Sequence, residues 1–292
     1  MDLDIPIDKH LTSSEFLPDG VPLSIYHTNE FTDFPLHTHE FSEIVIVLRG
    51  EGIHLVDDTE HHISAGDVFV IHGDKLHGYR DLRKFDHINL VYMPALIDLP
   101  TSVLSLPGYQ AFFAIEPLVA ARQPVQRRLH LSAVQLDTLS QLIDQLSHEL
   151  SEKLPCYTEM SMMYFQQIVI FLSRLYGQQS TPLSDRFLKL GHVITLLEQE
   201  FMSAWTVDSL ADVVCMSRRS LTRQFTDVMG VAPITYLIHI RLEQAAKLLV
   251  NTDHTITDIA LQVGFYDSNY LCKQFRRVHG ITPLKYRVNS RK

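Results

Sequence analysis

Two histidines and a glutamate stand close together in PLHTHEFSEIVIVLRG, residues 35–50. His37 and His39 are separated by one residue, and Glu43 follows four residues after His39, at the start of an apolar run. On a strand, residues two apart share a face, so we expect all three side chains to project the same way. Imidazole and carboxylate bind divalent metals and also form hydrogen bonds with polar small molecules. The segment therefore predicts a metal or ligand site at the mouth of a β-strand, in an enzyme or in a sensor.

The residues around this segment, about 22–93, predict several short strands separated by turns. The expected strands are EIVIVL (43–48), GIHLVD (52–57), GDVFVIH (66–72) and HINLVYM (87–93). In EIVIVL both alternating faces are apolar, which indicates a strand covered on both sides. Strands of this length and spacing predict a β-sandwich or a small barrel.

From about residue 129 the apolar period changes from that of a strand to that of a helix. Leucine, isoleucine and valine recur at steps of three and four, which predicts an amphipathic helix, and a second apolar helix is expected at 157–176. The first stripe consists of Leu131, Val134, Leu139, Leu142, Ile143, Leu146 and Leu150. Two interpretations stay open: the helices at 131–176 pack on their own sheet, or they pair with a second subunit in a homodimer. The polar segment GQQSTPLSD, 177–185, is predicted to be a linker.

A length of 292 residues suffices for two domains, and the charge is distributed unevenly between them. Residues 186–292 carry 14 Lys and Arg against 9 Asp and Glu, whereas the rest carries 11 against 25. A basic last third is typical of a domain that meets a polyanion such as nucleic acid. We expect a cytoplasmic protein that does not enter a membrane, because the start lacks a signal-peptide core and no apolar stretch reaches spanning length.

The three cysteines, Cys156, Cys215 and Cys272, lie far apart and form no CxxC pair. This spacing predicts neither a disulfide framework nor a thiolate zinc site. We expect Cys156 and Cys215 to be buried, reduced thiols.

The last third of the chain contains one internal repeat. LTRQFTDVMGVAPITY (221–236) matches LCKQFRRVHGITPLKY (271–286) at an offset of 50 residues. Each copy predicts a helix-turn-helix, at about 206–228 and 256–278, with Ser217 and Asp267 as caps of the respective second helices. A helix from Ile234 to about Val250 is expected between the copies, as a rigid spacer that holds two recognition helices about one turn of DNA (~34–36 Å) apart.

Polar side chains on the outer face of each second helix suit the major groove of double-stranded DNA. Arginine can bridge guanine O6 and N7, asparagine can pair with adenine, and the remaining residues can hold bases or phosphates. The predicted DNA-binding residues are Arg218, Arg219, Thr222, Arg223, Ser268, Asn269, Lys273 and Arg277. A solvated polar helix face is the alternative, which the repetition of the pattern disfavours.

The motifs MSRRSLTRQF and GFYDSNYLCKQFRRVHGITPLKYR resemble the AraC/XylS family of bacterial transcription regulators. The resemblance implies an α+β chain of two domains: an N-terminal cupin barrel of jelly-roll type followed by helices, then an all-α DNA-binding domain. The expected boundaries are 1–176 for effector sensing and dimerisation, 177–185 for the linker and 186–292 for DNA binding. The implied partners are promoter DNA, RNA polymerase and a second copy of the chain.

The spacing H-x-H-x3-E-x6-G, which ends at Gly50, resembles the first cupin motif. In that motif the three side chains join a later histidine on one metal, and His77 of GDVFVIHGDKLH stands in the matching place. The second motif departs from its pattern, since His72 replaces a proline and Asp74 a glycine. The implied ligand set is His37, His39, Glu43 and His77, which suits Zn, Fe, Mn or Ni. Alternatively, these residues only form hydrogen bonds in an effector pocket, with no metal required.

The sensor stretches HTHEFSEIVIVLRGEGIHLVDD and GDVFVIHGDKLHGY resemble the L-rhamnose-responsive regulators within this family. A sugar-like effector, with L-rhamnose as the first candidate, is therefore expected. The predicted effector-binding residues are His37, His39, Phe41, Glu43, His54 and His77. The expected function is a non-enzymatic, sugar-controlled activator of carbohydrate-utilisation genes. Two alternatives remain: a metal-dependent cupin enzyme with an attached DNA-binding domain, and an effector-independent repressor.

Overall fold

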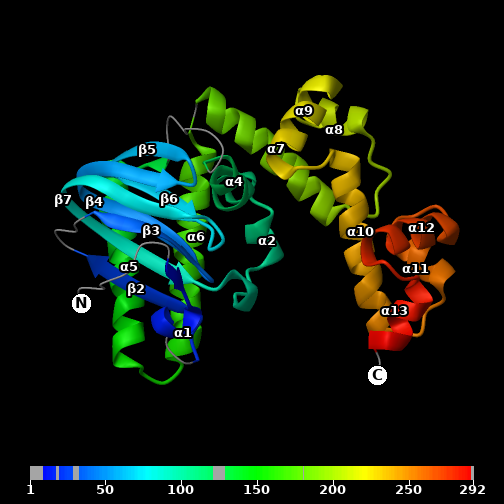
Figure 1. Cartoon of the computed structure of the whole chain (residues 1–292), viewed down its shortest axis with the longest axis horizontal. Coiled ribbons are helices and arrows are strands. Elements are labelled where there is room, and N and C mark those ends of the chain that lie inside the picture. The colour runs from blue at the N-terminus through cyan, green and yellow to red at the C-terminus, as the bar shows by residue number, and fades with distance from the viewer. Residues whose placement is uncertain (1–8, 18–19, 29–32, 121–128, 180, 291–292) are drawn as a thin grey trace. The chain divides into compact units, whose positions relative to one another are not determined.

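A break in packing near residue 188 divides the chain into two units, Met1–Leu188 and Lys189–Lys292. The computed structural model describes residues 9–17, 20–28, 33–120, 129–179 and 181–290. Strands followed by helices make up the first unit and helices the second, as Figure 1 shows. This confirms the predicted α+β class with a β-rich N-terminal domain. Within the described residues, no helix has both the length and the apolar character needed to cross a bilayer.

The first unit is built on eight strands. They are β1 Lys9–Leu11, β2 Leu23–Thr28, β3 Phe34–His39, β4 Ser42–Val56, β5 Thr59–Ser64, β6 Asp67–Ile71, β7 His77–Tyr92 and β8 Leu129–His130. β1 pairs with β3 in parallel, and the other pairs are antiparallel.

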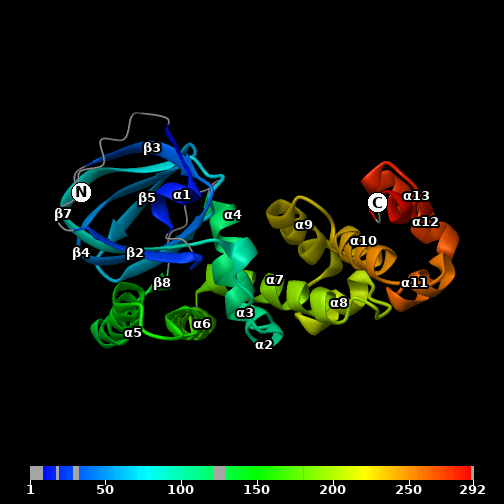
Figure 2. The ribbon, with the colours of Figure 1, turned by 90° about the horizontal axis from the view of Figure 1, so that it is seen from below.

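The two long strands, β4 and β7, run through both layers of this fold (Figures 1 and 2). The first half of β4 lies between β6 and β7, and its second half lies between β5 and β7. β7 pairs with β3 at its start and with β2 at its end. The result is a jelly-roll-like double layer, in which the pairings among described residues run from β1 to β8 without closing into a ring.

Gly50 explains why one long strand replaces two predicted ones. EIVIVL and GIHLVD belong to the same strand, β4, so the prediction of a turn between them is wrong. Gly50 has a φ of +80°, and a Cβ there would collide with the carbonyl oxygens of Arg83 and Lys84. Glycine tolerates both conditions, which lets β4 bend while it stays paired with β7.

Two long helices, α5 (Ala133–Glu152) and α6 (Tyr157–Gly177), pack against each other beside the strands (Figure 2). Leu139, Ile143 and Leu146 of the predicted stripe are buried within the chain itself, whereas Val134 is 77% exposed. The centre of the stripe therefore packs inside this unit. Shorter helices complete it: α1 Ser13–Phe16, η1 Pro94–Leu96, α2 Thr101–Leu104, α3 Pro107–Tyr109, the π-helix η2 Gln110–Ile115 and α4 Glu116–Ala120.

The second unit consists of helices arranged as two similar modules. The helices are α7 Pro182–Gln199, whose first residues precede the division at Leu188, α8 Val207–Val213, α9 Arg218–Met229, α10 Pro233–Asn251, α11 Ile256–Gln262, α12 Ser268–His279 and α13 Pro283–Ser290. Leu221 and Phe225 of α9 and the repeat-related Leu271 and Phe275 of α12 are fully buried. Each helix pair, α8 with α9 and α11 with α12, thus folds around the same two positions. α7 begins inside the segment 177–185 that was expected as a linker.

The sequence predicts the polar helix caps correctly, but not the exposure of the two cysteines that lie beside helix ends. The side chain of Ser217 accepts a hydrogen bond from the backbone N of Ser220, and Asp267 accepts one from Tyr270, so both predicted caps are confirmed. Cys156 and Cys215 are exposed, and the expectation that they are buried is wrong. Both adopt a positive φ beside a helix end, where the chain turns at the surface.

Candidate sensor site and nucleic-acid interface

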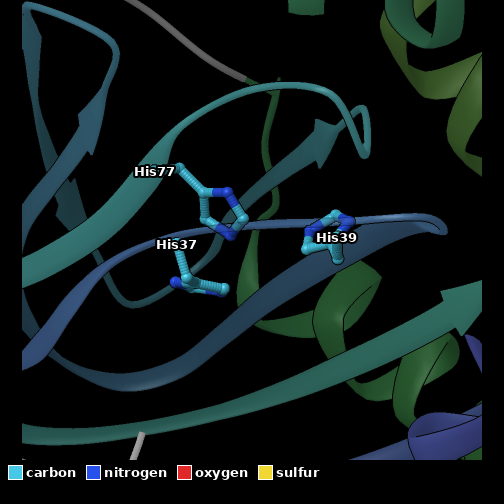
Figure 3. A group of neighbouring side chains, drawn as sticks. All are labelled: His37, His39 and His77. Carbon is cyan, nitrogen blue, oxygen red and sulfur yellow. The ribbon is translucent and has the colours of Figure 1, made fainter. Parts of the chain in front are cut away.

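Three histidines meet inside the first unit. His37 and His39 lie on β3, and His77 lies at the start of β7, directly opposite His37 in the β3–β7 pairing. Figure 3 shows the three rings turned toward one another from these two strands. One ring nitrogen from each histidine lies within 4.8 Å of the other two, and all three residues are buried. The geometry is that of a trio able to share one ligand.

Glu43 joins the three histidines from a different strand. The expectation that His37, His39 and Glu43 lie on one strand is wrong, because the chain bends at Glu40 and Phe41 and Glu43 belongs to β4. The bend nevertheless brings the carboxylate to the site. Its oxygens lie 3.6 Å from Nε2 of His39 and 3.7 Å from Nε2 of His77.

Backbone carbonyls fix the orientation of each imidazole. Nδ1 of His37 donates to the oxygen of Pro35 at 3.0 Å, that of His39 to Phe41 at 2.6 Å, and that of His77 to Lys75 at 3.0 Å. A donating Nδ1 leaves Nε2 as the unprotonated nitrogen of a neutral ring. Nε2 of His39 and Nε2 of His77 are buried and accept no hydrogen bond from any described residue. Metal-binding histidines are held in this way by their second nitrogen.

The site combines an ionised carboxyl group with the neutral imidazoles of His37 and His77. Burial lowers the pKa of His37 and of His77, so both rings are neutral at neutral pH. Burial alone would raise the pKa of Glu43, but the adjoining imidazoles, His39 above all, outweigh it and hold that pKa below its ordinary value. The carboxylate of Glu43 faces histidine nitrogens, and no Lys or Arg among the described residues pairs with it. A buried negative charge of this kind favours a cation as its partner.

The loop before His77 departs from the second cupin motif at His72 and Asp74, and it packs against the bend between β3 and β4. The backbone N of His39 donates to the oxygen of Gly73 at 2.9 Å, and a Cβ at Gly73 would collide with the oxygens of His39 and Phe41. Gly73 therefore permits the close approach of loop and bend. His72, which replaces the proline, donates from Nε2 to the oxygen of Phe113 at 2.9 Å. This bond connects the loop before His77 with η2.

The remaining predicted effector residues, Phe41 and His54, surround the trio. Phe41 is fully buried and stacks on His39, with ring centres 4.2 Å apart. His54 stacks between Phe69 and Tyr79, and its ring centre lies 5.9 Å from that of His77. A cavity of about 10 Å³ borders His54, far below the ~300–1,000 Å³ typical of small-molecule pockets. Its other lining residues are Val56, Phe69, Val70, Ile71, His72, Lys75, Glu116, Pro117 and Ala120. Binding of a sugar here requires these side chains to move apart.

The buried His87 is expected to make the stability of the first unit depend on pH. It is 4% exposed on β7, and burial lowers its pKa from 6.5 to about 4, only partly offset by Glu43 and Asp86. Between these values the unfolded chain binds a proton that the folded chain does not, so stability falls as pH falls from 6.5 to 4. The loss of folding free energy attributable to His87 is about 3 kcal/mol.

Denaturant unfolding at several pH values tests this role of His87. The free energy of unfolding should depend less steeply on pH in His87→Gln, whereas His62→Gln, at an exposed position of β5, should keep the wild-type dependence. Equal slopes for all three proteins would contradict this role.

The predicted DNA-binding residues lie on the outward face of the second helix of each module. Arg218, Arg219 and Arg223 on α9 are exposed, as are Asn269, Lys273 and Arg277 on α12. Thr222 and Ser268 are half-buried. At equivalent repeat positions Arg219 corresponds to Asn269 and Arg223 to Lys273. The two helices therefore present different side chains, which suit different base sequences.

Two arginines have structural partners that the sequence did not indicate. Arg218 forms a surface ion pair with Asp208 at 3.4 Å, which connects α9 with the first turn of α8. Arg287, interpreted from the sequence as a phosphate contact or surface charge, donates to the oxygens of Leu249 and His254 at 3.2 and 2.6 Å. It therefore holds the segment between α10 and α11.

The sequence gives little indication of a role for Arg241, which is buried on α10. Its only sequence signal is its place on α10, at the four-residue step between Leu237 and Ala245, where an apolar residue is expected.

Comparison with known proteins agrees with both halves of this description. A family model described as an AraC-like ligand binding domain matches residues 22–167, and one described as a helix-turn-helix domain matches residues 210–289. The chain is 35% identical to the HTH-type transcriptional activator RhaR of Escherichia coli O1:K1 and 34% identical to that of strain K12. Each match extends over 262 residues and covers 89% of both chains.

Solved structures with similarity to the chain include the DNA-binding domain of AdpA in complex with a target DNA. That structure is 33% identical, with a TM-score of 0.34, and the match covers 35% of this chain and 93% of that one. Apo ToxT from Vibrio cholerae matches over 92% of this chain and 98% of its own, at 12% identity and a TM-score of 0.33.

A ligand-binding domain model matches half of the chain, and a helix-turn-helix model matches the residues behind it. Relatives above 30% identity are matched over 89% of both chains. The chain therefore belongs to the AraC family of DNA-binding transcription regulators.

Proposed function

We propose that this chain is a cytoplasmic, sugar-controlled transcription activator that binds promoter DNA through α9 and α12 and carries out no catalysis. The observation that carries the proposal is the pairing of two exposed, non-identical recognition faces with a buried polar cluster in a separate unit. The similarity to proteins named as transcriptional activators supports the sign of regulation. L-rhamnose is the first candidate effector, and carbohydrate-utilisation genes are the proposed targets.

The proposed mechanism is a shift between a closed and an open sensor. A sugar that binds beside His54 must open the small cavity, and the loop that carries His72 lines that cavity. His72 connects through Phe113 to η2, and a Cβ at Gly108 of α3 would collide with the oxygen of Ser173 on α6. Movement at the cavity is thus transmitted to α6, where Met163 is 59% exposed. We propose that the exposed side of α5 and α6 pairs with a second copy, and that the effector favours the state that contacts RNA polymerase.

Calorimetry of the full chain against L-rhamnose, other monosaccharides and uronic acids tests the effector. We expect binding heat with one of these sugars, and tighter promoter binding in its presence, because a ligand that prefers the open state shifts the population toward it. Promoter binding without heat from any sugar would contradict effector control and would favour the alternative of an effector-independent repressor.

A second function of the same site is divalent metal binding, which we propose for His37, His39, His77 and Glu43. The supporting observation is the set of oriented imidazoles beside an ionised carboxylate, with two buried Nε2 atoms that accept no hydrogen bond from described residues. A bound Zn, Fe, Mn or Ni ion would supply positive charge to this cluster and a coordination position for sugar hydroxyls. An ion, unlike a sugar, needs little additional room.

Metal analysis of the full chain as purified tests this site. We expect about one equivalent of one metal per chain and a loss of it in His77→Gln, since removal of a ligand weakens coordination. Excess metal at 100 times its Kd should stabilise the sensor by about 2.7 kcal/mol relative to the chelator-treated protein.

His62→Gln, which changes an exposed histidine, should keep the wild-type metal content. Equal metal content in His77→Gln and the wild type would rule out this ligand set. Consumption of a sugar by the metal-loaded chain would instead favour the cupin-enzyme alternative.

A further inference from the structure

Arg241 connects α10 with the segment that precedes the first helix-turn-helix. Its side chain is 9% exposed in the middle of α10. Nε donates to the oxygen of Phe201 at 2.6 Å, and Nη2 donates to the oxygen of Ser203 at 2.8 Å. Both carbonyls belong to the short segment between α7 and α8. The planar fork of the guanidinium thus fixes the place where the first module begins.

The same guanidinium reaches the turn of the second helix-turn-helix. Its Cζ lies 5.7 Å from the ring centre of Phe265, between α11 and α12. At the neighbouring Gly264, with a φ of +86°, a Cβ would lie 3.0 Å from Cζ of Arg241 and 2.8 Å from Cα of Met202. The segment before the first module and the turn of the second module therefore meet at Arg241.

Apolar packing supports the same junction. Phe201 packs against the buried cluster of the second module, which includes Phe265, Leu271 and Phe275. A residue that precedes the first module thus shares a core with the second. The polar contacts of Arg241 and the apolar contacts of Phe201 therefore both join the segment before α8 to the second module.

A buried arginine at this position is not explained by stability alone. No Asp or Glu among the described residues forms an ion pair with Arg241, and backbone carbonyls accept its hydrogen bonds. Burying an unpaired guanidinium carries a desolvation cost that an apolar side chain would avoid. The arginine instead fixes a geometry, because its contacts form only when the carbonyls of Phe201 and Ser203 and the ring of Phe265 keep their relative positions.

We propose that Arg241 is a positioning residue that locks the two helix-turn-helix modules at one separation and orientation, so that α9 and α12 engage two major-groove segments in a fixed spacing. This inference rests on the proposed reading of DNA by both helices. Arg241 itself touches no base in this role, and it acts through the place of Gly264 and Phe265 relative to Phe201 and Ser203.

The test is the dependence of DNA affinity on spacing. A duplex is selected in vitro with the wild-type full chain, and a second duplex carries one extra base pair between the two contacted segments, which rotates one segment by about 34° relative to the other. The affinities of wild type, Arg241→Met and Arg241→Lys for both duplexes are measured by fluorescence anisotropy. Arg287→Met is the matched control, because Arg287 also binds two carbonyls but joins only elements that flank the second module.

For wild type we expect the insertion to weaken binding at least about 10-fold, the effect of losing base contacts in one segment. For Arg241→Met we expect weaker binding to the selected duplex but a penalty for the insertion of less than about 3-fold, since the modules no longer hold one spacing. Arg241→Lys, which can keep one of the two carbonyl contacts, should lie between them. Arg287→Met should keep the wild-type penalty.

The outcomes separate the possible failures. A wild-type chain that is indifferent to the insertion would overturn the reading of DNA by two helices. A wild-type penalty retained in Arg241→Met or in Arg241→Lys would overturn the role of Arg241 alone. Partial unfolding lowers affinity for both duplexes by the same factor and leaves their ratio unchanged, so the ratio reports positioning rather than stability.

Discussion

Alanine at both Arg219 and Asn269 is expected to abolish sequence-specific promoter binding while the sensor keeps its stability. Both side chains are exposed near the start of their recognition helices, and they occupy equivalent repeat positions. Arginine suits guanine and asparagine suits adenine, with roughly 1–3 kcal/mol of discrimination for each good bidentate pair. Each single variant should therefore lose about 5- to 150-fold in specific affinity, and the double variant should approach the affinity for unrelated DNA.

The measurement is titration of a selected duplex and of a scrambled duplex at fixed salt. Loss of base contacts lowers the ratio of the two affinities, whereas loss of a phosphate contact lowers both affinities together. Arg174→Ala removes the same charge from the exposed face of α6 and should leave both affinities unchanged. An unchanged affinity ratio in Arg219→Ala and Asn269→Ala would show that these two side chains do not recognise bases.

Phe275→Ala should destabilise the second unit by about 3–5 kcal/mol, the usual cost of removing a large buried ring. The ring is fully buried between α10, α11 and α12, and its centre lies 5.3 Å from that of Tyr286. The single tryptophan of the chain, Trp205, lies in the second unit. Its fluorescence during denaturant unfolding therefore reports the stability of that unit separately from the sensor.

Tyr266→Ala is the matched control, because this aromatic residue is 85% exposed on the same module and its loss leaves no cavity. We expect its unfolding midpoint to stay near that of the wild type. If Phe275→Ala and Tyr266→Ala shifted the midpoint equally, the assigned core of the second module would be incorrect. DNA binding should fall in Phe275→Ala in proportion to the unfolded fraction.

Local patterns predicted the DNA-binding half well because its elements are encoded over short distances. Four-residue spacing placed Leu221 with Phe225, and Leu271 with Phe275, on the buried face, and Arg223 and Lys273 between them are exposed as expected. The caps at Ser217 and Asp267 followed from residue type and position. These signals act within one turn of helix, so they can be recognised without knowledge of the remaining chain.

The sensor site was only partly predictable, since it depends on contacts between distant strands. The sequence indicated His37, His39, Glu43 and His77 through their spacing and a motif resemblance, but it suggested one strand where the chain bends. The pairing of β3 with β7 places His37 opposite His77, 40 residues later. The small cavity and the burial of His87 likewise arise from layers that meet only in the folded unit.

The sequence by itself determined the family, the two-unit organisation with a sensor before a duplicated helix-turn-helix, and the polar positions on the outer face of each second helix. Periodicity and repetition are local properties of the chain, which explains why they sufficed. The tertiary structure alone decided how the three histidines and Glu43 converge, which arginines are exposed on the second helices and which hold carbonyls, and what Arg241 connects. Those outcomes depend on strand register, on bends permitted by Gly50 and Gly73, and on the packing of segments far apart in the chain.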